Sequence, residues 1–150
     1  RDMGHTLEMY LPELEDAAAR GLPMVCTNPD REVLRGDARE ICAGAMAEAY
    51  ESRMGGDVAW HGKPYRPVFD EVMRSIGSPD QSRVLMIGDG LATDIAGAAA
   101  AGLDSAFVVS GIAGEKLGVS YGDLPRAEKL ADILAVAPAA PTYAIPGLIW

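Results

Sequence analysis

The sequence predicts an α/β fold built around a parallel β-sheet that helices cover on both faces. From residue 58 onward, short apolar stretches alternate with helical patterns, an order typical of βαβ units with right-handed crossovers. The chain has 150 residues, about the size of one domain. Hydrophobic residues make up 49% and charged residues 23% of the chain, which indicates a globular rather than a disordered protein.

The first third of the chain contains two predicted helices with a strand between them. Apolar residues recur at helical spacing over residues 7–18, but Pro12 interrupts the pattern, so either the helix begins next to this proline or its first part is irregular. Residues 22–27 follow a glycine and form a predicted strand. We expect a polar loop through residues 36–37 and then a second helix over residues 38–54, whose many alanines indicate close packing.

Strands and helices alternate over the rest of the chain. The clearest amphipathic stripe lies in a predicted helix over residues 65–76, and Pro64 is expected in the first turn of this helix. The chain ends in a tail that is too apolar to lie free in water, and we expect this tail to dock on the sheet. The other predicted elements are, in order, strands over residues 58–61 and 84–87, a helix over 95–101, a strand over 105–110, a glycine-rich loop and a helix over 124–136.

Two carboxylates lie on one connection between a strand and a helix. The strand over residues 84–87 runs into a Gly-Asp-Gly turn, which predicts Asp89 at the carboxyl end of the strand and Asp94 near the first turn of the next helix. Ligands of open parallel sheets bind outside the carboxyl ends of the strands, and two carboxylates there can hold Mg²⁺. The alternative interpretation is a common turn, with Asp94 serving only as a helix cap or dipole partner.

Lys63 is expected at the same edge of the sheet. It lies between a predicted strand and a predicted helix, and Gly62 and Pro64 restrict the backbone on either side of it. A lysine beside two carboxylates would suit a metal-assisted phosphoryl site, because the lysine and the metal neutralise charge on the phosphate. The alternative is a solvated lysine near a helix start, where a positive charge is mildly unfavourable.

The overall charge and the cysteines limit the choice of partners. The net charge is −9, which argues against nucleic acid or an anionic membrane surface, although local charges can still bind a small phosphorylated molecule. No apolar run in the sequence approaches the roughly 18 residues that a membrane span needs. Cys26 and Cys42 fit no metal or redox motif, so we expect two buried thiols in a reducing cytoplasm.

The order of these motifs resembles the haloacid dehalogenase (HAD) superfamily of phosphatases. Gly-Lys-Pro at 62–64 and Gly-Asp with a second Asp-Ile pair at 88–95 resemble its third and fourth motifs. Residues 26–30 and 108–112 resemble its capped subfamily IIA, the NagD and 4-nitrophenylphosphatase-like enzymes. The resemblance implies a three-layer α/β/α Rossmann-like core. Residues 1–56 would be the remainder of an α/β cap domain, and residues 57–150 would be the C-terminal half of that core.

The resemblance also implies residue roles in a Mg²⁺-dependent phosphatase that acts on a small phosphorylated metabolite. Asp89 would bind Mg²⁺ directly, and Asp94 would bind it partly through water or position Lys63. Lys63 would bind the phosphoryl group and the carboxylate of the nucleophile. Asn28 is a weaker candidate for substrate binding, because its place in an Asn-Pro-Asp sequence favours a turn. His61, just before the lysine motif, is more typical of a structural residue than of an acid–base group.

The first and second motifs of the family are missing from the sequence. The family attacks phosphate through an Asp-x-Asp motif and binds it with a Ser or Thr of a second motif, and Asp2, Asp30 and Asp80 do not fit the first of these. We therefore expect the C-terminal half of a longer enzyme, which alone would bind metal weakly and catalyse little. Half a sheet would leave an edge strand unpaired, so we also expect self-association, for example a homodimer, or pairing with a missing segment.

Two other classes of protein stay open. A non-catalytic regulatory module could have kept a phosphate- and metal-binding site but lost the nucleophile. It would then bind Mg²⁺ or phosphate without turnover. A receiver-like α/β protein would use other residues and would lack a cap, and the cap-like first third of the chain argues against this class.

Overall fold

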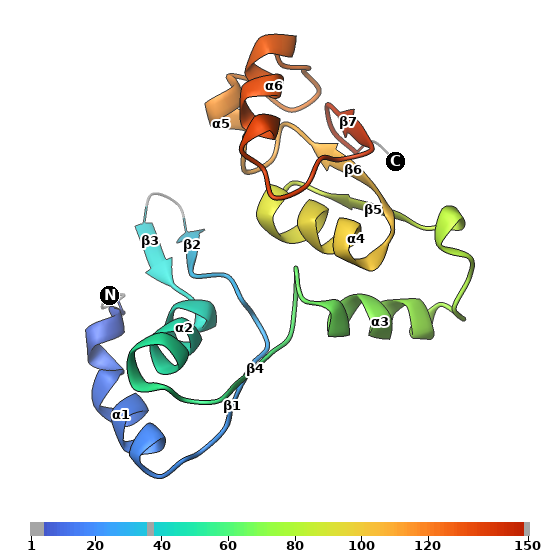
Figure 1. The fold of residues 1–150 in the computed structure, drawn as a ribbon. Coiled ribbons are helices and arrows are strands. Elements are labelled where there is room, and N and C mark those ends of the chain that lie inside the picture. Colours follow the sequence, from blue (N-terminus) through green and yellow to red (C-terminus); the bar gives the residue numbers. More distant parts are fainter. Residues whose placement is uncertain (1–4, 36–37, 149–150) are drawn as a thin grey trace. The chain divides into compact units, whose positions relative to one another are not determined.

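The computed structural model describes residues 5–35 and 38–148, which fall into two compact units (Figure 1). One unit lies within Arg1–Gly62 and the other within Lys63–Trp150. The predicted loop residues 36–37 and the last two residues of the tail lie outside the described residues. The units divide after Gly62, and the assignment of residues 1–56 to a cap stays a prediction. None of the helices in the described ranges has the length and apolar character needed to cross a membrane.

The first unit combines two helices with two pairs of short strands. Strand β1 pairs in parallel with β4, and β2 pairs in antiparallel with β3. Helix α2 is buried along its alanine-rich part, where Ala47 and Ala49 are at most 2% exposed, so the predicted close packing is confirmed. The elements are η1 (Leu7–Met9), α1 (Leu11–Ala19), β1 (Met24–Cys26), β2 (Glu32–Arg35), β3 (Ala38–Ile41), α2 (Ala43–Met54) and β4 (Val58–Trp60).

The sequence prediction was right about α1 and wrong about residues 32–35 and 38–41. Helix α1 begins at Leu11 with Pro12 in its first turn, where a missing backbone N–H costs nothing. Residues 32–35 of the predicted polar loop and residues 38–41 of the predicted second helix pair as the β2–β3 hairpin instead, and α2 begins only at Ala43. A Gly-Asp dipeptide between two short stretches that can form strands is a hairpin signal. Pairing of the two strands gives hydrogen-bond partners to more backbone N–H and C=O groups than a helix start would.

One of the two predicted buried thiols is confirmed. Cys26 is 2% exposed, and burial raises the pKa of its thiol because the charged form loses its hydration. Cys42 is only half-buried, at the N-terminal end of α2. Both cysteines are free thiols.

The second unit is a three-stranded parallel sheet with helices packed on it. The strand order is β5-β6-β7, and β7 pairs in parallel with β6, which confirms that the apolar tail docks on the sheet. Helix α5 lies where the sequence predicted only a loop. The elements are α3 (Arg66–Ser75), η2 (Gln81–Arg83), β5 (Leu85–Gly88), the π-helical turn η3 (Leu91–Ile95), α4 (Ala96–Ala101), β6 (Asp104–Val108), α5 (Gly114–Leu117), α6 (Ala127–Ala135) and β7 (Tyr143–Ile145).

The start of α3 differs from the sequence prediction. Tyr65 is the N-cap of this helix, and Pro67 rather than Pro64 lies in its first turn. Pro64 instead follows Lys63 in a cis peptide bond, outside the helix. A proline at either position is compatible with the first turn of a helix. Which of the two lies there depends on where the first hydrogen-bonded turn begins, and the local sequence does not fix that point.

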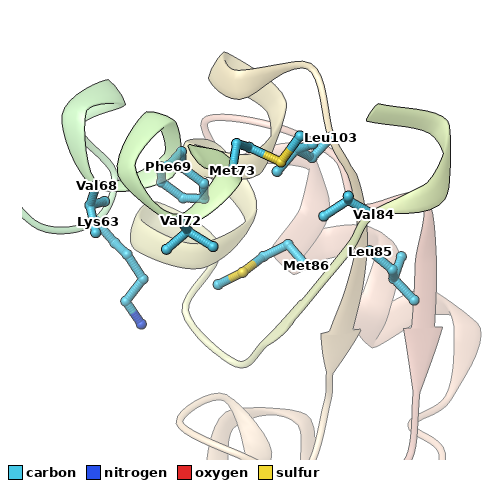
Figure 2. Close-up of a pocket in the computed structure, with 9 residues that line it drawn as sticks. All are labelled: Lys63, Val68, Phe69, Val72, Met73, Val84, Leu85, Met86 and Leu103. Carbon is cyan, nitrogen blue, oxygen red and sulfur yellow. The ribbon is translucent and has the colours of Figure 1, made fainter. Parts of the chain in front are cut away.

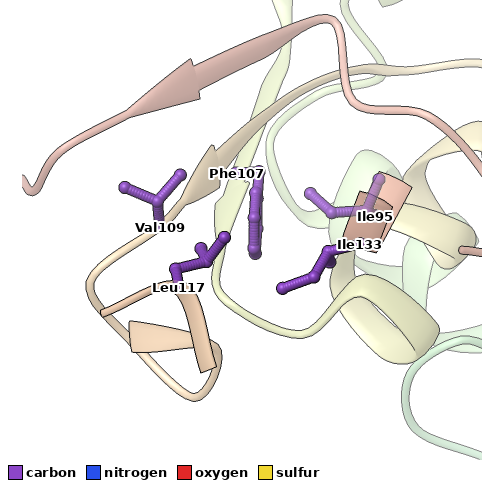
Figure 3. Packing of buried hydrophobic residues seen from close by; sticks show 5 residues of the cluster. All are labelled: Ile95, Phe107, Val109, Leu117 and Ile133. Atoms are coloured by element: carbon purple, nitrogen blue, oxygen red, sulfur yellow. The ribbon is translucent and has the colours of Figure 1, made fainter. Parts of the chain in front are cut away.

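Two apolar clusters join the helices to the strands of this unit. Figure 3 shows the first, in which Ile95, Leu117 and Ile133 gather with Val109 around the Phe107 side chain of β6. The second packs α3 on α4 and is made of Phe69, Ala98 and Ala101, with Val68, Met86 and Leu103 against them. By the register of the sheet, Met86 and Phe107 share one face. On the other face of β5, Leu85 and Ile87 are 46% and 38% exposed.

We predict that Phe107→Ala destabilises the protein strongly. The Phe107 side chain is 0% exposed, so its removal loses apolar burial and leaves a cavity that costs about 3–5 kcal/mol of the free energy of unfolding. Urea denaturation followed by circular dichroism measures this loss. Val136→Ala is the control, because Val136 is 79% exposed and its truncation should cost less than about 0.5 kcal/mol. Equal losses for the two variants would contradict the assignment of the core.

Candidate functional site

The connection after β5 places the two predicted carboxylates where the sequence put them. Asp89 directly follows β5, and Asp94 lies on the π-helical turn before α4. The carbonyl oxygen of Gly90 accepts hydrogen bonds from the N–H groups of Asp94 at 2.8 Å and Ile95 at 3.1 Å. The bond from Ile95 spans five residues, which makes this a wide π-turn. Such turns are frequent at functional sites.

The Asp94 carboxylate holds the site together. It lies in a residue that is only 3% exposed, and its Oδ2 accepts hydrogen bonds from the N–H groups of Asp89 at 3.1 Å and Gly90 at 3.0 Å. Its Oδ1 pairs with Nζ of Lys63, whose side chain is 49% exposed. A buried carboxylate needs such donors, because its lost hydration must be replaced. The predicted neighbours Lys63 and Asp94 are therefore in direct contact.

Asp89 is fastened by one oxygen only. Its Oδ2 accepts a hydrogen bond from the N–H of Ile112, at 3.0 Å, in the loop after β6. Within residues 5–35 and 38–148, no hydrogen bond reaches its Oδ1. This oxygen is the group of the site best suited to bind a cation.

Glycines allow the backbone to lie directly against both carboxylates. A Cβ atom at Gly88 would come within 2.3 Å of Asp94 Oδ2, and one at Gly111 would come within 2.2 Å of Asp89 Oδ2. Real Cβ atoms do not approach this closely, so any side chain at either position would displace a carboxylate. The cradle that holds the two carboxylates therefore depends on glycine.

The two carboxylates fit Mg²⁺ as part of a site. Mg²⁺ prefers oxygen ligands and keeps several waters when one or two carboxylates bind it. Across the described part of the chain, no three His, Cys, Asp or Glu side chains cluster as metal ligands. The chain thus offers Asp89 as a direct ligand, and Asp94 next to it already has both oxygens engaged.

The packing of α3 on α4 brings Lys63 to Asp94. Gly97 lies three residues after Asp94, on the same face of the helix. A Cβ atom at Gly97 would lie 2.4 Å from the Phe69 ring and 3.0 Å from the Cα of Pro64. The absence of a side chain at Gly97 therefore lets the segment that begins with Lys63 approach α4 closely.

An apolar pocket of about 180 Å³ lies beside Lys63. Figure 2 shows Lys63 and Val68 at one end of its lining and Val84 and Leu85 at the other, with Nζ of Lys63 directed away from the apolar side chains. The remaining lining residues are Phe69, Val72, Met73, Met86 and Leu103. The lysine therefore presents an apolar stem to the pocket and its charge to the carboxylate.

Asn28 and His61 belong to the first unit. The Asn28 side chain accepts a hydrogen bond from the N–H of Asp30 at 3.2 Å, which is the turn that the sequence favoured. Substrate binding by Asn28 stays a prediction. The backbone N–H of His61 donates to the carbonyl oxygen of Cys26 at 2.7 Å and continues the β1–β4 pairing, and the role of the His61 side chain stays a prediction.

The backbone that supports the site was not predicted from the sequence. Neither the N–H of Ile112 nor the close approaches at Gly97 and Gly111 were singled out. Two signals pointed to them: a glycine soon after a buried strand and an isolated glycine inside an alanine-rich helix.

The fold and the site define a class of protein. A parallel sheet with a lysine and two carboxylates at a strand end is an α/β protein with a candidate phosphate site. The chain matches the haloacid dehalogenase-like hydrolase family over residues 7–102 and the HAD-hydrolase-like family over residues 60–147, and each match covers more than half of the chain. The chain therefore belongs to the haloacid dehalogenase-like hydrolases.

Several solved structures and a curated protein are similar to this chain. A haloacid dehalogenase-like hydrolase from Brucella suis is 35% identical, with a TM-score of 0.73, over 99% of this chain and 52% of its own. Glycerol phosphate phosphatase from Mycobacterium tuberculosis, in complex with calcium, is 30% identical, with a TM-score of 0.58, over 75% of this chain and 32% of its own. A p-nitrophenyl phosphatase from Archaeoglobus fulgidus shares the fold at 22% identity and a TM-score of 0.71, over 98% of this chain and 51% of its own.

A short stretch is also 49% identical to the pyrimidine 5'-nucleotidase YjjG of Escherichia coli, over 41 residues, which are 27% of this chain and 18% of that protein. The chain spans about half the length of the Brucella and Archaeoglobus proteins.

We predict that Asp94→Asn destabilises the protein more than Asp70→Asn does. The NH₂ group of the new amide is a donor, and it would face another donor, either the Lys63 ammonium or the backbone N–H groups. Because the site is buried, this mismatch should lower the free energy of unfolding by about 2–4 kcal/mol. Asp70 is the matched control, since it pairs with Arg66 at the surface and its loss should cost less than about 1 kcal/mol. Urea denaturation measures both. Equal costs would show that Asp94 does not hold the site together.

Proposed function

We propose that the parent protein of this chain is a Mg²⁺-dependent phosphatase of the capped subfamily IIA, which acts on a small phosphorylated metabolite in the cytoplasm. The observation that carries this proposal is the contact between Lys63 and Asp94 beside Asp89, at the carboxyl end of β5. Membership of the hydrolase family supports it. So do the named activities of the glycerol phosphate phosphatase and the 5'-nucleotidase, which both release phosphate from small molecules.

The side chains of the site suit a phosphate monoester. An ammonium group has three N–H donors, so Lys63 can keep its contact with Asp94 and still donate to a phosphoryl oxygen. Asp94 holds the lysine in place, and Asp89 keeps Oδ1 for the cation. When bound, Mg²⁺ supplies positive charge that offsets the charge of the phosphoryl oxygens.

The nucleophile of the proposed reaction lies outside these 150 residues. In the family that the chain resembles, an aspartate carboxylate attacks phosphorus, the P–O bond to the alcohol breaks, and the alcohol leaves with a proton from the second aspartate of Asp-x-Asp. Water then gives a proton back to the second aspartate and attacks the aspartyl phosphate, which releases inorganic phosphate and restores the first carboxylate. The described residues place only two carboxylates at the site, so a further carboxylate from another segment would complete it.

A non-catalytic binding module is the second candidate. The observation that favours it is the missing Asp-x-Asp motif, because the same site without a nucleophile would bind Mg²⁺ or phosphate and turn nothing over. Self-association is part of both proposals. Its support is the edge strand β5, which exposes Leu85 and Ile87 in the described part of the chain.

We predict that extending the reading frame upstream reveals Asp-x-Asp after an apolar strand, and that the longer protein hydrolyses p-nitrophenyl phosphate only with Mg²⁺. Lys63→Met and Asp89→Asn should each lower kcat/KM at least about 100-fold, because each removes charge from the site of the phosphoryl group. Lys116→Met on α5 is the control for loss of an exposed lysine, and its activity should not change.

Three results separate the candidate functions. An upstream reading frame that encodes no Asp-x-Asp motif would contradict the phosphatase proposal. Binding of Mg²⁺ and inorganic phosphate without turnover in the longer protein would favour the regulatory module. Full activity of both Lys63→Met and Asp89→Asn would show that the reaction does not take place at this site.

A further inference from the structure

We propose that Gly111 is a positioning residue that fixes the Asp89 carboxylate for a divalent cation. The proposal rests on the proposed function, since it assigns a role within the same site. It concerns the loop over residues 109–112, which follows β6 and contributes no side chain to the lysine–carboxylate contact.

The loop holds Asp89 by backbone alone. The Ile112 N–H donates to Asp89 Oδ2 at 3.0 Å, and a Cβ atom on Gly111 would lie 2.2 Å from the same oxygen and 2.3 Å from the Cβ of Asp89. The Asp89 side chain therefore lies directly against Gly111. With Oδ2 engaged in this way, the side chain cannot rotate freely, and Oδ1 stays the oxygen that a cation can reach.

The loop itself is fastened to the C-terminal strand. The Val109 N–H donates to the carbonyl oxygen of Ile145 at 3.0 Å, and the Ser110 hydroxyl donates to that of Pro146 at 2.6 Å. Val109 is 0% exposed and packs in the cluster around Phe107 (Figure 3). Because the loop is held on this side, a side chain at Gly111 would be accommodated by moving Asp89 rather than the loop.

The experiment is a Mg²⁺ titration of the ¹⁵N-labelled chain, followed by the NMR shifts of the Asp89 and Ile112 amides. Titration to millimolar Mg²⁺ at constant ionic strength detects weak binding. We expect Gly111→Ala to weaken Mg²⁺ binding at least about tenfold, the usual cost of a lost supporting contact at a metal ligand. Gly114→Ala, at the first residue of α5 just after the loop, is the matched control, since a Cβ there meets only Val119 O at 3.3 Å and Val109 O at 3.8 Å.

A metal-free double-mutant cycle tests the contact itself. Gly111→Ala should lower Tm in the wild-type background and should cost much less in the Asp89→Gly background, where both the carboxylate and the Cβ that overlap it are gone. If Gly111→Ala does not fold, Ser110→Ala serves instead. It releases the loop from Pro146 and should weaken Mg²⁺ binding severalfold, and Ser110→Thr, which keeps the hydroxyl, should restore it.

The outcomes separate this inference from the proposed function. A wild-type chain whose Asp89 amide does not respond to Mg²⁺ overturns this inference, because Asp89 would then not be held ready for a cation in this chain, whereas the proposed function is tested by the activity of the longer protein. Wild-type binding with unchanged affinity in Gly111→Ala, or in Ser110→Ala if that variant is used, overturns the role of Gly111 alone. An equal loss in Gly111→Ala and Gly114→Ala would also overturn it, because the effect would then come from the loop in general.

Discussion

The site depends on the buried carboxylate of Asp94. Three donors surround it: the N–H groups of Asp89 and Gly90 and the ammonium of Lys63. These donors come from the end of β5, from the turn after it and from the segment before α3, so one charge joins three parts of the second unit. A network of this kind is stable only when every partner is present, because a single lost donor leaves a buried charge poorly compensated.

Glycines set the distances around that charge. Gly88, Gly97 and Gly111 each lie where a Cβ atom would overlap a neighbour, at Asp94, at the Phe69 ring and at Asp89 respectively. At all three positions the backbone lies where a side chain would otherwise be, which lets Lys63 contact Asp94 and lets the Asp89 carboxylate lie against Gly111. The chemistry of the site therefore comes from three charged side chains, and its geometry comes largely from residues without a side chain.

The sequence predicted the charged residues better than their surroundings. Lys63, Asp89 and Asp94 could be placed because a buried strand followed by a turn and a helix is a local pattern, and the carboxyl ends of parallel strands meet at one edge. The contact of Ile112 with Asp89 joins residues 23 apart in the chain and depends on the register of β5 and β6, which no local pattern reports. The β2–β3 hairpin was missed because β2 is short and begins and ends with a charged residue, and the residues of β3 continue into the helical pattern of α2. The π-turn was missed because a single bond that spans five residues leaves no periodic pattern in the sequence.

Hydrogen exchange at the Asp89 and Gly90 amides tests the central role of Asp94 most directly. If the Asp94 carboxylate accepts both N–H groups, these two amides exchange slowly in the wild-type chain and at least about tenfold faster in Asp94→Ala, while the amide of Phe107 in β6 stays protected in both. Exchange of the two amides as fast as in an unstructured peptide in the wild-type chain would contradict the account, since the carboxylate would then not hold the turn.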